Sequence, residues 1–286
     1  MSLVAVPNVS EGRDAELIAR LADAVARAGA RVADVHSDPV HNRTVITAAA
    51  APGTLVDAMA ALAEAALEID LTVHAGVHPR LGVLDVCPFV VDGAPGAEVA
   101  AVARSAGAAI ASGSRLPVYL YGYAATRPEC ANLPDLRRGG LDGLIQRVGP
   151  PDFGPRTIDP RRGVVCVGAR DVLIAFNVWL RCDLAVARRI ASDVRSHPGL
   201  AGVRALGLDL GGGRAQVSMN LTRPGVSGVD RTYEVVAALA ADGGAAVEGT
   251  ELVGVPPERY LPDPGAEAAR LLLRPGRSLE AALAGA

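Results

Sequence analysis

The sequence contains no lysine, because all 28 of its basic residues are arginine. A chain without lysine has no Walker P-loop lysine, no Schiff-base lysine for pyridoxal phosphate and no lysine general base. Any side chain that clamps an anion with a permanent positive charge is therefore an arginine, whose planar guanidinium suits carboxylates. A GC-rich genome would also produce this usage, and the exclusions hold with either origin.

Aromatic residues are also scarce, at 3% of the 286 residues, and the net charge of −3 comes without a basic block. Binding of nucleic acid favours aromatic stacking platforms or a positive stripe, and neither is visible. The four cysteines stand far apart without a CxxC pair, which argues against a disulfide scaffold or a zinc ribbon. No uncharged apolar run reaches about 18 residues, and no signal-peptide pattern opens the chain. We therefore expect a cytoplasmic protein that acts on small molecules, without a nucleic-acid or membrane partner.

Half of the chain is hydrophobic, and its periodicity predicts one order of elements twice: strand, helix, strand, strand, helix, strand. The first set has strands at 3–6, 31–36, 44–48 and 83–91 and helices at 14–28 and 52–69, extended by a helix at 97–111 and a strand at 118–121. The second set has strands at 172–180, 203–208, 215–221 and 246–253 and helices at 184–195 and 233–241. This is the split-βαβ order.

The expected fold class is therefore α+β, with two βαββαβ (ferredoxin-like) α/β sandwich subdomains facing each other across a crevice. We place the subdomains at residues 1–168 and 169–286. Two open sheet faces that meet form a favoured place for a ligand. The glycine-rich stretch 207–215 joins two predicted strands and predicts a hairpin turn rather than a phosphate cradle. The tail at 263–286 has helical runs broken by proline and glycine, and it either wraps the subdomain or frays.

Four of the five histidines stand in two polar stretches, HSDPVHN and HAGVHPR. Histidine titrates close to neutral pH, which suits proton transfer or metal binding. His74 and His78 have the spacing of a helical zinc pair, but Gly76 and Pro79 argue against a helix and the glutamate of such a motif is missing. The proline and Arg80 behind His78 give it a stiff, charged setting that favours proton transfer. A structural loop histidine is the alternative for both.

Three further polar stretches are open to two interpretations each. In VPNVSEGR, residues 6–13, the side chains of Asn8, Ser10 and Glu11 either cap the following helix or line a pocket. The stretch 36–45 is an Asx-rich turn, or a site that offers the carboxylate of Asp38 and the cation of Arg43. The stretch PDFGP, residues 151–155, is a rigid linker or a loop that grips a ligand.

Taken together, these segments resemble the glutamate formiminotransferase family. The matching stretches run in order from Pro7 to about Glu258, and they are VPNVSEGR, NRTV, HPRLGVLDVCPF, PVYLYG, PDFGP, GARDVLIAFNVWL, AQVSMNLT and GTELVGVPPE. The resemblance implies a transferase that moves the formimino group of N-formimino-L-glutamate to N5 of tetrahydrofolate, its co-substrate, in histidine degradation and one-carbon metabolism. The resemblance also implies a homodimer, and the reaction requires no metal.

The resemblance assigns roles to residues as well. In this family the histidine of the HPR motif transfers protons, and it falls on His78, while the PDFGP loop and the residues after it touch the folate. Arg43 and Arg80 are our candidates for the glutamate carboxylates, which favour bidentate guanidinium partners, and Asp38 or His36 would orient His78 or a substrate. The residues predicted to bind substrate or folate are Asn8, Ser10, His36, Asp38, Asn42, Arg43, Arg80, Pro151, Asp152, Phe153, Gly154, Pro155 and Pro160.

The chain also departs from the family. Animal members have a glutamate where this chain has Val77, an aspartate where it has His36, and lysines around polyglutamylated folate. These departures keep three alternatives open. One is transfer of formyl from N-formylglutamate in the same pocket. Another is a non-catalytic relative that binds folate or glutamate, and the third is a metal-dependent hydrolase built on the four clustered histidines.

Overall fold

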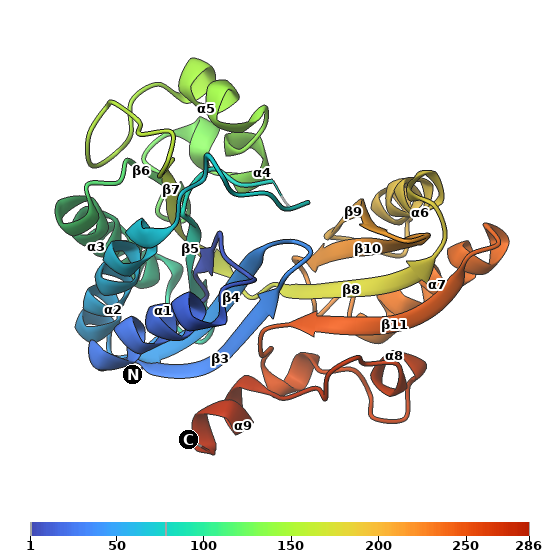
Figure 1. The fold of residues 1–286 in the computed structure, drawn as a ribbon. Coiled ribbons are helices and arrows are strands. Elements are labelled where there is room, and N and C mark those ends of the chain that lie inside the picture. Colours follow the sequence, from blue (N-terminus) through green and yellow to red (C-terminus); the bar gives the residue numbers. More distant parts are fainter. Residues whose placement is uncertain (1, 78, 286) are drawn as a thin grey trace. The chain divides into compact units, whose positions relative to one another are not determined.

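The computed structural model of the chain describes residues 2–77 and 79–285. The predicted proton-transfer residue, His78, lies outside these described residues. The chain divides into two compact units, Met1–Asp171 and Val172–Ala286 (Figure 1). Among the described residues, no helix combines the length and the apolar character needed to cross a bilayer.

The N-terminal unit is built on a seven-stranded mixed sheet in which β3 pairs with β4 and the other strands follow in the order β1-β4-β2-β5-β7-β6. The strands are β1 (Leu3–Ala5), β2 (Asn8–Val9), β3 (Arg31–Asp38), β4 (Arg43–Ala50), β5 (Leu84–Val91), β6 (Val118–Gly122) and β7 (Val165–Asp171). The short strands β1 and β2 lie between β4 and β5, antiparallel to both. The predicted βαββαβ order is therefore confirmed in this unit.

Three helices pack on one face of this sheet, where they lie side by side in Figure 1. They are α1 (Ala15–Arg27), α2 (Pro52–Ala65), followed by the 3₁₀ turn η1 (Ala66–Glu68), and α3 (Gly96–Ser114). Helix α1 begins where the side chain of Asp14 accepts a hydrogen bond from the backbone N–H of Leu17, and its apolar positions recur with helical spacing. This layer leaves the β3–β4 part of the opposite face for polar residues.

The opposite face is covered over β5, β7 and β6 by a second apolar cluster. It includes the short turn η2 (Pro128–Cys130) and the helices α4 (Leu133–Leu136) and α5 (Gly140–Val148). Strand β7, which the sequence did not predict, is inserted parallel to both β5 and β6. Because it is buried on both faces, it is a continuous apolar run without the alternation that marks a half-exposed strand.

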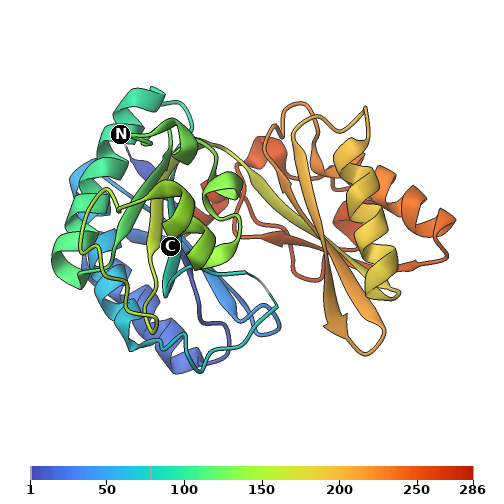
Figure 2. The same cartoon turned by 90° about the horizontal axis from the view of Figure 1, so that it is seen from above.

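The C-terminal unit repeats the motif on a four-stranded antiparallel sheet, in the order β11-β8-β10-β9. Its elements are β8 (Ile174–Arg181), α6 (Leu184–Ser196), β9 (Val203–Gly211), β10 (Arg214–Leu221), α7 (Val229–Asp242) and β11 (Ala246–Val253). In Figure 2, helix α6 runs alongside the strands of this sheet. The predicted hairpin is confirmed, because β9 and β10 pair across a turn whose glycines have positive φ.

The tail packs against this unit. It contains the 3₁₀ turn η3 (Glu258–Tyr260) and the helices α8 (Glu267–Arg270) and α9 (Leu279–Ala284). The backbone N–H of Thr250 in β11 donates to the carbonyl of Leu271, and Leu273 donates back to Thr250. The tail therefore adds backbone pairing along the edge of β11.

Candidate active site

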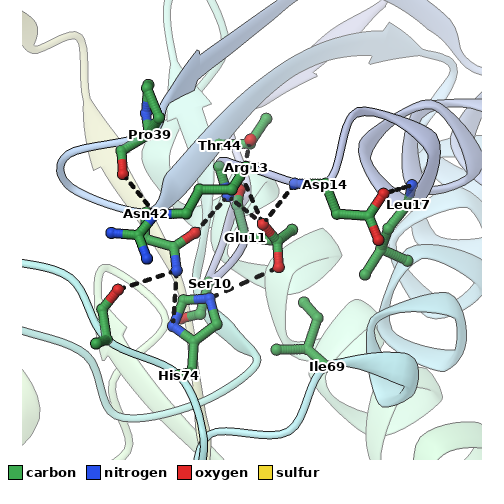
Figure 3. Close-up of polar contacts among 12 residues, drawn as sticks. Ser10, Glu11, Arg13, Asp14, Leu17, Pro39, Asn42, Thr44, Ile69 and His74 are labelled. Atoms are coloured by element: carbon green, nitrogen blue, oxygen red, sulfur yellow. Dashed lines mark hydrogen bonds and ion pairs between the residues drawn. The ribbon is translucent and has the colours of Figure 1, made fainter.

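Three loops converge at one end of the N-terminal sheet. One joins β2 to α1, one is the β3–β4 hairpin, and one leads from η1 to β5 and carries the HPR motif. Figure 3 shows Glu11, Asn42 and His74, one residue from each loop, pointing toward one another. The structure thus joins VPNVSEGR, HSDPVHN and HAGVHPR into one polar cluster.

Glu11 holds its own loop in shape. Its Oε1 accepts hydrogen bonds from the backbone N–H groups of Gly12 at 2.9 Å, Arg13 at 2.7 Å and Asp14 at 2.9 Å. The hydroxyl of Thr44 on β4 donates to the carbonyl of Glu11 at 2.6 Å. Three backbone donors hold the carboxylate of Glu11 in one position, so this turn presents a fixed negative charge just before α1.

Asn42 connects the three loops. Its backbone is left-handed, with φ of 49°, a conformation that asparagine tolerates better than most residues. Its Oδ1 accepts from the backbone N–H of Gly12 at 2.9 Å, and its Nδ2 donates to the carbonyl of Ala75 at 3.0 Å. The predicted site residue Asn42 therefore fixes the geometry of the cluster.

His74 lies between a carboxylate and two donors. Its Nε2 is 3.7 Å from Oε2 of Glu11, while its Nδ1 faces Nδ2 of Asn42 at 3.4 Å and is contacted by the guanidinium of Arg80. Both groups at Nδ1 can only donate, so Nδ1 must accept and the proton of the neutral ring belongs on Nε2, toward Glu11. Burial and the Arg80 charge lower the pKa of His74, against the opposing effect of Glu11.

This lowered pKa predicts how stability depends on pH. The unfolded chain binds a proton at His74 at about pH 6.5, whereas the folded chain binds it only at lower pH, so stability falls as pH drops through that window. We expect His74→Asn to flatten the decline in the free energy of unfolding between pH 7 and pH 5, measured by denaturant titration. Identical slopes for the variant and the parent chain would show that His74 does not contribute.

The arginines of the cluster are half-buried cations. Arg43, at the start of β4, donates from Nη2 to Oδ1 of Asn8, whose Nδ2 donates to the carbonyl of Val6 at 2.8 Å. Burial lowers the pKa of Arg43 to about 10, and Asp85 opposes that shift. Arg80 donates from Nη2 to the carbonyl of His41 at 3.2 Å and from Nη1 to His74. Both guanidiniums remain charged at pH 7, so two cations stand near the carboxylates of Glu11 and Asp85.

The structure also places the other predicted residues of this region. Asp38 accepts from the backbone N–H groups of Val40 and His41, both at 2.8 Å, so it shapes the hairpin turn as an Asx turn does. His36 is buried on β3 opposite Val45, and Asn8 pairs with the same Val45, which places His36 and Asn8 on one face of the sheet.

Neither Asn8 nor Ser10 contacts the first amides of α1, so the capping interpretation is wrong for both. The hydroxyl of Ser10 donates to the carbonyl of Gly82 at 2.7 Å, which ties the VPNVSEGR loop to the segment after the HPR motif. Asp14 is the cap, and Glu11 supports the turn that leads to it.

The PDFGP stretch lies beside β6 and not in the Glu11–Asn42–His74 cluster. Phe153 exchanges backbone hydrogen bonds with Val118, and its partly buried side chain packs against the helix-side core. Asp152 accepts from the backbone N–H of Leu120 at 2.8 Å and from Arg127 at 3.0 Å. These contacts give Pro151, Asp152, Phe153, Gly154 and Pro155 a fixed path along the sheet edge.

Pro160 lies nearer to the histidine loop. It belongs to a turn in which Arg162 and Gly163 donate to the carbonyl of Asp159, and the neighbouring carbonyl of Arg161 accepts from the backbone N–H of Leu71. The structure therefore brings the stretch 159–163, but not 151–155, against the base of the loop that carries His74.

Two residues of this region were not predicted from the sequence. Asp85 is a fully buried carboxylate in β5, and Arg137 pairs with it through Nη1 at 2.8 Å. A lone charge in the apolar run LDVCPFVV is a signal that could have identified Asp85. Arg137 stands in a loop with no distinguishing pattern. Within residues 2–77 and 79–285, no group of three or more His, Cys, Asp or Glu side chains is arranged to hold a metal ion.

Comparisons with known proteins cover both units. Residues 2–170 match the family model of the formiminotransferase domain, N-terminal subdomain, and residues 175–267 match that of the formiminotransferase domain. The glutamate formimidoyltransferase of Thermoplasma acidophilum is 38% identical over 276 residues, which is 92% of this chain and 91% of that protein. A protein of the same name from Streptococcus pyogenes is 37% identical, with 90% of each chain covered. The formimidoyltransferase-cyclodeaminase of Sus scrofa is 39% identical over 91% of this chain but only 51% of its own length.

Proposed function

The chain belongs to the formiminotransferase family, and we propose that His78 moves the protons in its reaction. The enzyme transfers the formimino group of N-formimino-L-glutamate to N5 of tetrahydrofolate, which is a co-substrate, and releases glutamate. A homodimer and a cytoplasmic location complete the proposal.

The chemistry needs one group that takes a proton and then gives it back. N5 of a reduced folate is largely neutral at pH 7, so its lone pair attacks the formimino carbon without prior deprotonation. The tetrahedral intermediate loses the proton from N5, and the glutamate nitrogen gains a proton as its bond to the formimino carbon breaks. A histidine with a pKa near 6.5 serves both steps, which is worth about 10²–10⁴ in rate.

A group of half-buried arginines supports binding of the glutamate part of the donor. The guanidiniums of Arg80 and Arg137 lie close enough to Arg43 to lower its pKa, and Asp85 interacts with all three arginines. Asp85 is already bonded to Arg137 and to the backbone N–H of Leu81. A guanidinium pairs readily with a carboxylate, and the nearness of the Arg43 and Arg80 guanidiniums to each other is the observation that carries the assignment of both to the donor carboxylates.

We assign the remaining residues by their place around this face. Asn8 and Ser10 lie on or beside β2, and His36, Asp38 and Asn42 on β3 and its hairpin, where they would shape the donor subsite. The fixed PDFGP stretch and the turn at Pro160 would contact the folate, as in the family. Alignment of two bound substrates would supply much of the remaining rate, because effective molarities in well-oriented reactions are large.

The proposal is tested by mixing purified protein with tetrahydrofolate and either N-formiminoglutamate or N-formylglutamate, and following the absorbance of the folate product. We expect turnover with the formimino donor that survives treatment with a chelator. Turnover with the formyl donor alone would move the function to the sister reaction. Folate binding by calorimetry without turnover would indicate a non-catalytic relative, and loss of activity to the chelator would favour a metal-dependent enzyme.

A further inference from the structure

Asp85 and Arg137 together hold the backbone on both sides of Arg80. Oδ1 of Asp85 accepts from the backbone N–H of Leu81 at 2.7 Å, and its Oδ2 accepts from Nη1 of Arg137 at 2.8 Å. Nη2 of the same guanidinium donates to the carbonyl of Pro79 at 2.7 Å. The carbonyl before Arg80 and the amide after it are therefore tied to one ion pair.

The pair is well placed to be rigid. The side chain of Asp85 is 2% exposed and stands in the central part of the sheet, on β5, while that of Arg137 is 16% exposed and comes from the segment after α4, 52 residues away. Among the described residues, Arg137 is the residue between β6 and α5 that takes part in these hydrogen bonds. A guanidinium that bridges two acceptors fixes both in direction as well as in distance.

We propose that Arg137, directly at Pro79 and through Asp85 at Leu81, is a positioning residue for proton transfer by the HPR segment, a role that rests on the proposed function. Arg137 does not itself touch the reacting atoms. It holds the carbonyl of Pro79 directly and the amide of Leu81 through Asp85, and so fixes the backbone of the HPR motif on both sides of Arg80.

Stability alone does not account for such a pair. A buried ion pair often contributes no more to stability than well-packed apolar residues would, because desolvation of both charges offsets their attraction. The geometric effect is different, since a displacement of about 1 Å in a catalytic group can reduce the rate about 10²-fold. The expected consequence of losing the pair is a loss of turnover at nearly unchanged substrate affinity.

The test compares Arg137→Gln with Arg138→Gln, a matched control at the neighbouring arginine. Arg138 is 72% exposed and pairs with Asp135 on the surface. We expect Arg137→Gln to lower kcat about 10²-fold with the KM of each substrate within about threefold, and Arg138→Gln to keep kcat within about twofold. Arg137→Lys keeps the charge but reaches only one acceptor, so its kcat should fall between those of the parent chain and Arg137→Gln. Equal kcat values for Arg137→Gln and Arg138→Gln, or a change confined to KM, would overturn the proposal.

Amide hydrogen exchange gives a readout that does not depend on turnover. In Arg137→Gln the amide of Leu81 should exchange faster than in the parent chain, while the amide of Val83, which donates to the carbonyl of Arg162 at 2.9 Å, should be unchanged. Unchanged exchange at Leu81 would show that Arg137 does not hold this turn. If the parent chain shows no transfer at all, the proposed function fails, and the exchange measurement still decides whether the clamp exists.

Discussion

Replacing His78 with asparagine should lower kcat for formimino transfer by about 10²–10⁴, the range that a positioned acid–base group contributes. Asparagine is similar in size and polar, but it cannot accept the proton of N5 or return one to the leaving nitrogen. The KM values of both substrates should remain within a few fold, because the proton moves only in the transition state. Circular dichroism would confirm that the variant is folded.

The matched control is His197→Asn in the C-terminal unit. The Nδ1 of His197 accepts a hydrogen bond from the backbone N–H of Gly199 at 3.1 Å, a local turn contact outside the histidine cluster. This variant should keep kcat within about twofold. Turnover of His78→Asn within a few fold of the parent chain would remove His78 from the chemistry.

Replacing Gly82 with alanine should destabilise the N-terminal unit by about 1–3 kcal/mol, the usual cost of inserting a group into a packed site. A Cβ on Gly82 would lie 1.9 Å from the carbonyl oxygen of Val164. At this point Gly82 forms an antiparallel bridge with Gly163, and Val164 donates to the carbonyl of Leu81 at 2.9 Å. The added methyl must push the segment after the HPR motif away from Val164, directly before β7, so kcat should also fall.

Gly53→Ala is the control for this substitution. Gly53 lies in the first turn of α2, and a Cβ there meets no atom within 4 Å. Alanine should leave stability unchanged or raise it by up to about 1 kcal/mol, because it restricts the unfolded chain. Denaturant unfolding measures both variants. Equal stability of Gly82→Ala and Gly53→Ala would contradict the close approach of Gly82 to Val164.

Strands β5 and β6 were predicted as buried apolar runs, and the long helices were predictable because each has one exposed face. Helix α1 shows this well: Leu17, Leu21 and Val25 recur with helical spacing, and Gly29 follows where the helix ends. Strand β7 was missed although its residues 165–169 are a buried apolar run of the same kind, and this run follows a loop rich in proline and arginine. Its pairing with β5 and β6 depends on contacts distant in sequence, which a local pattern cannot show.

The site was predictable as a set of segments rather than as a set of contacts. Asn42 and Arg43 were selected from composition and resemblance, and the structure places both beside the histidine loop. The side chain of Glu11 appeared as a possible cap, although its second oxygen faces His74. Arg137 could not be found, because its role arises only when the segment after α4 folds back onto β5.

The most direct test of the account is the pH dependence of kcat for the parent chain and for His78→Asn, measured with both substrates saturating. We expect the parent rate to fall at acid pH, as the histidine loses its capacity to accept the N5 proton, and the small residual rate of the variant to lack this limb. An acid limb and a rate in His78→Asn that match those of the parent chain would contradict it.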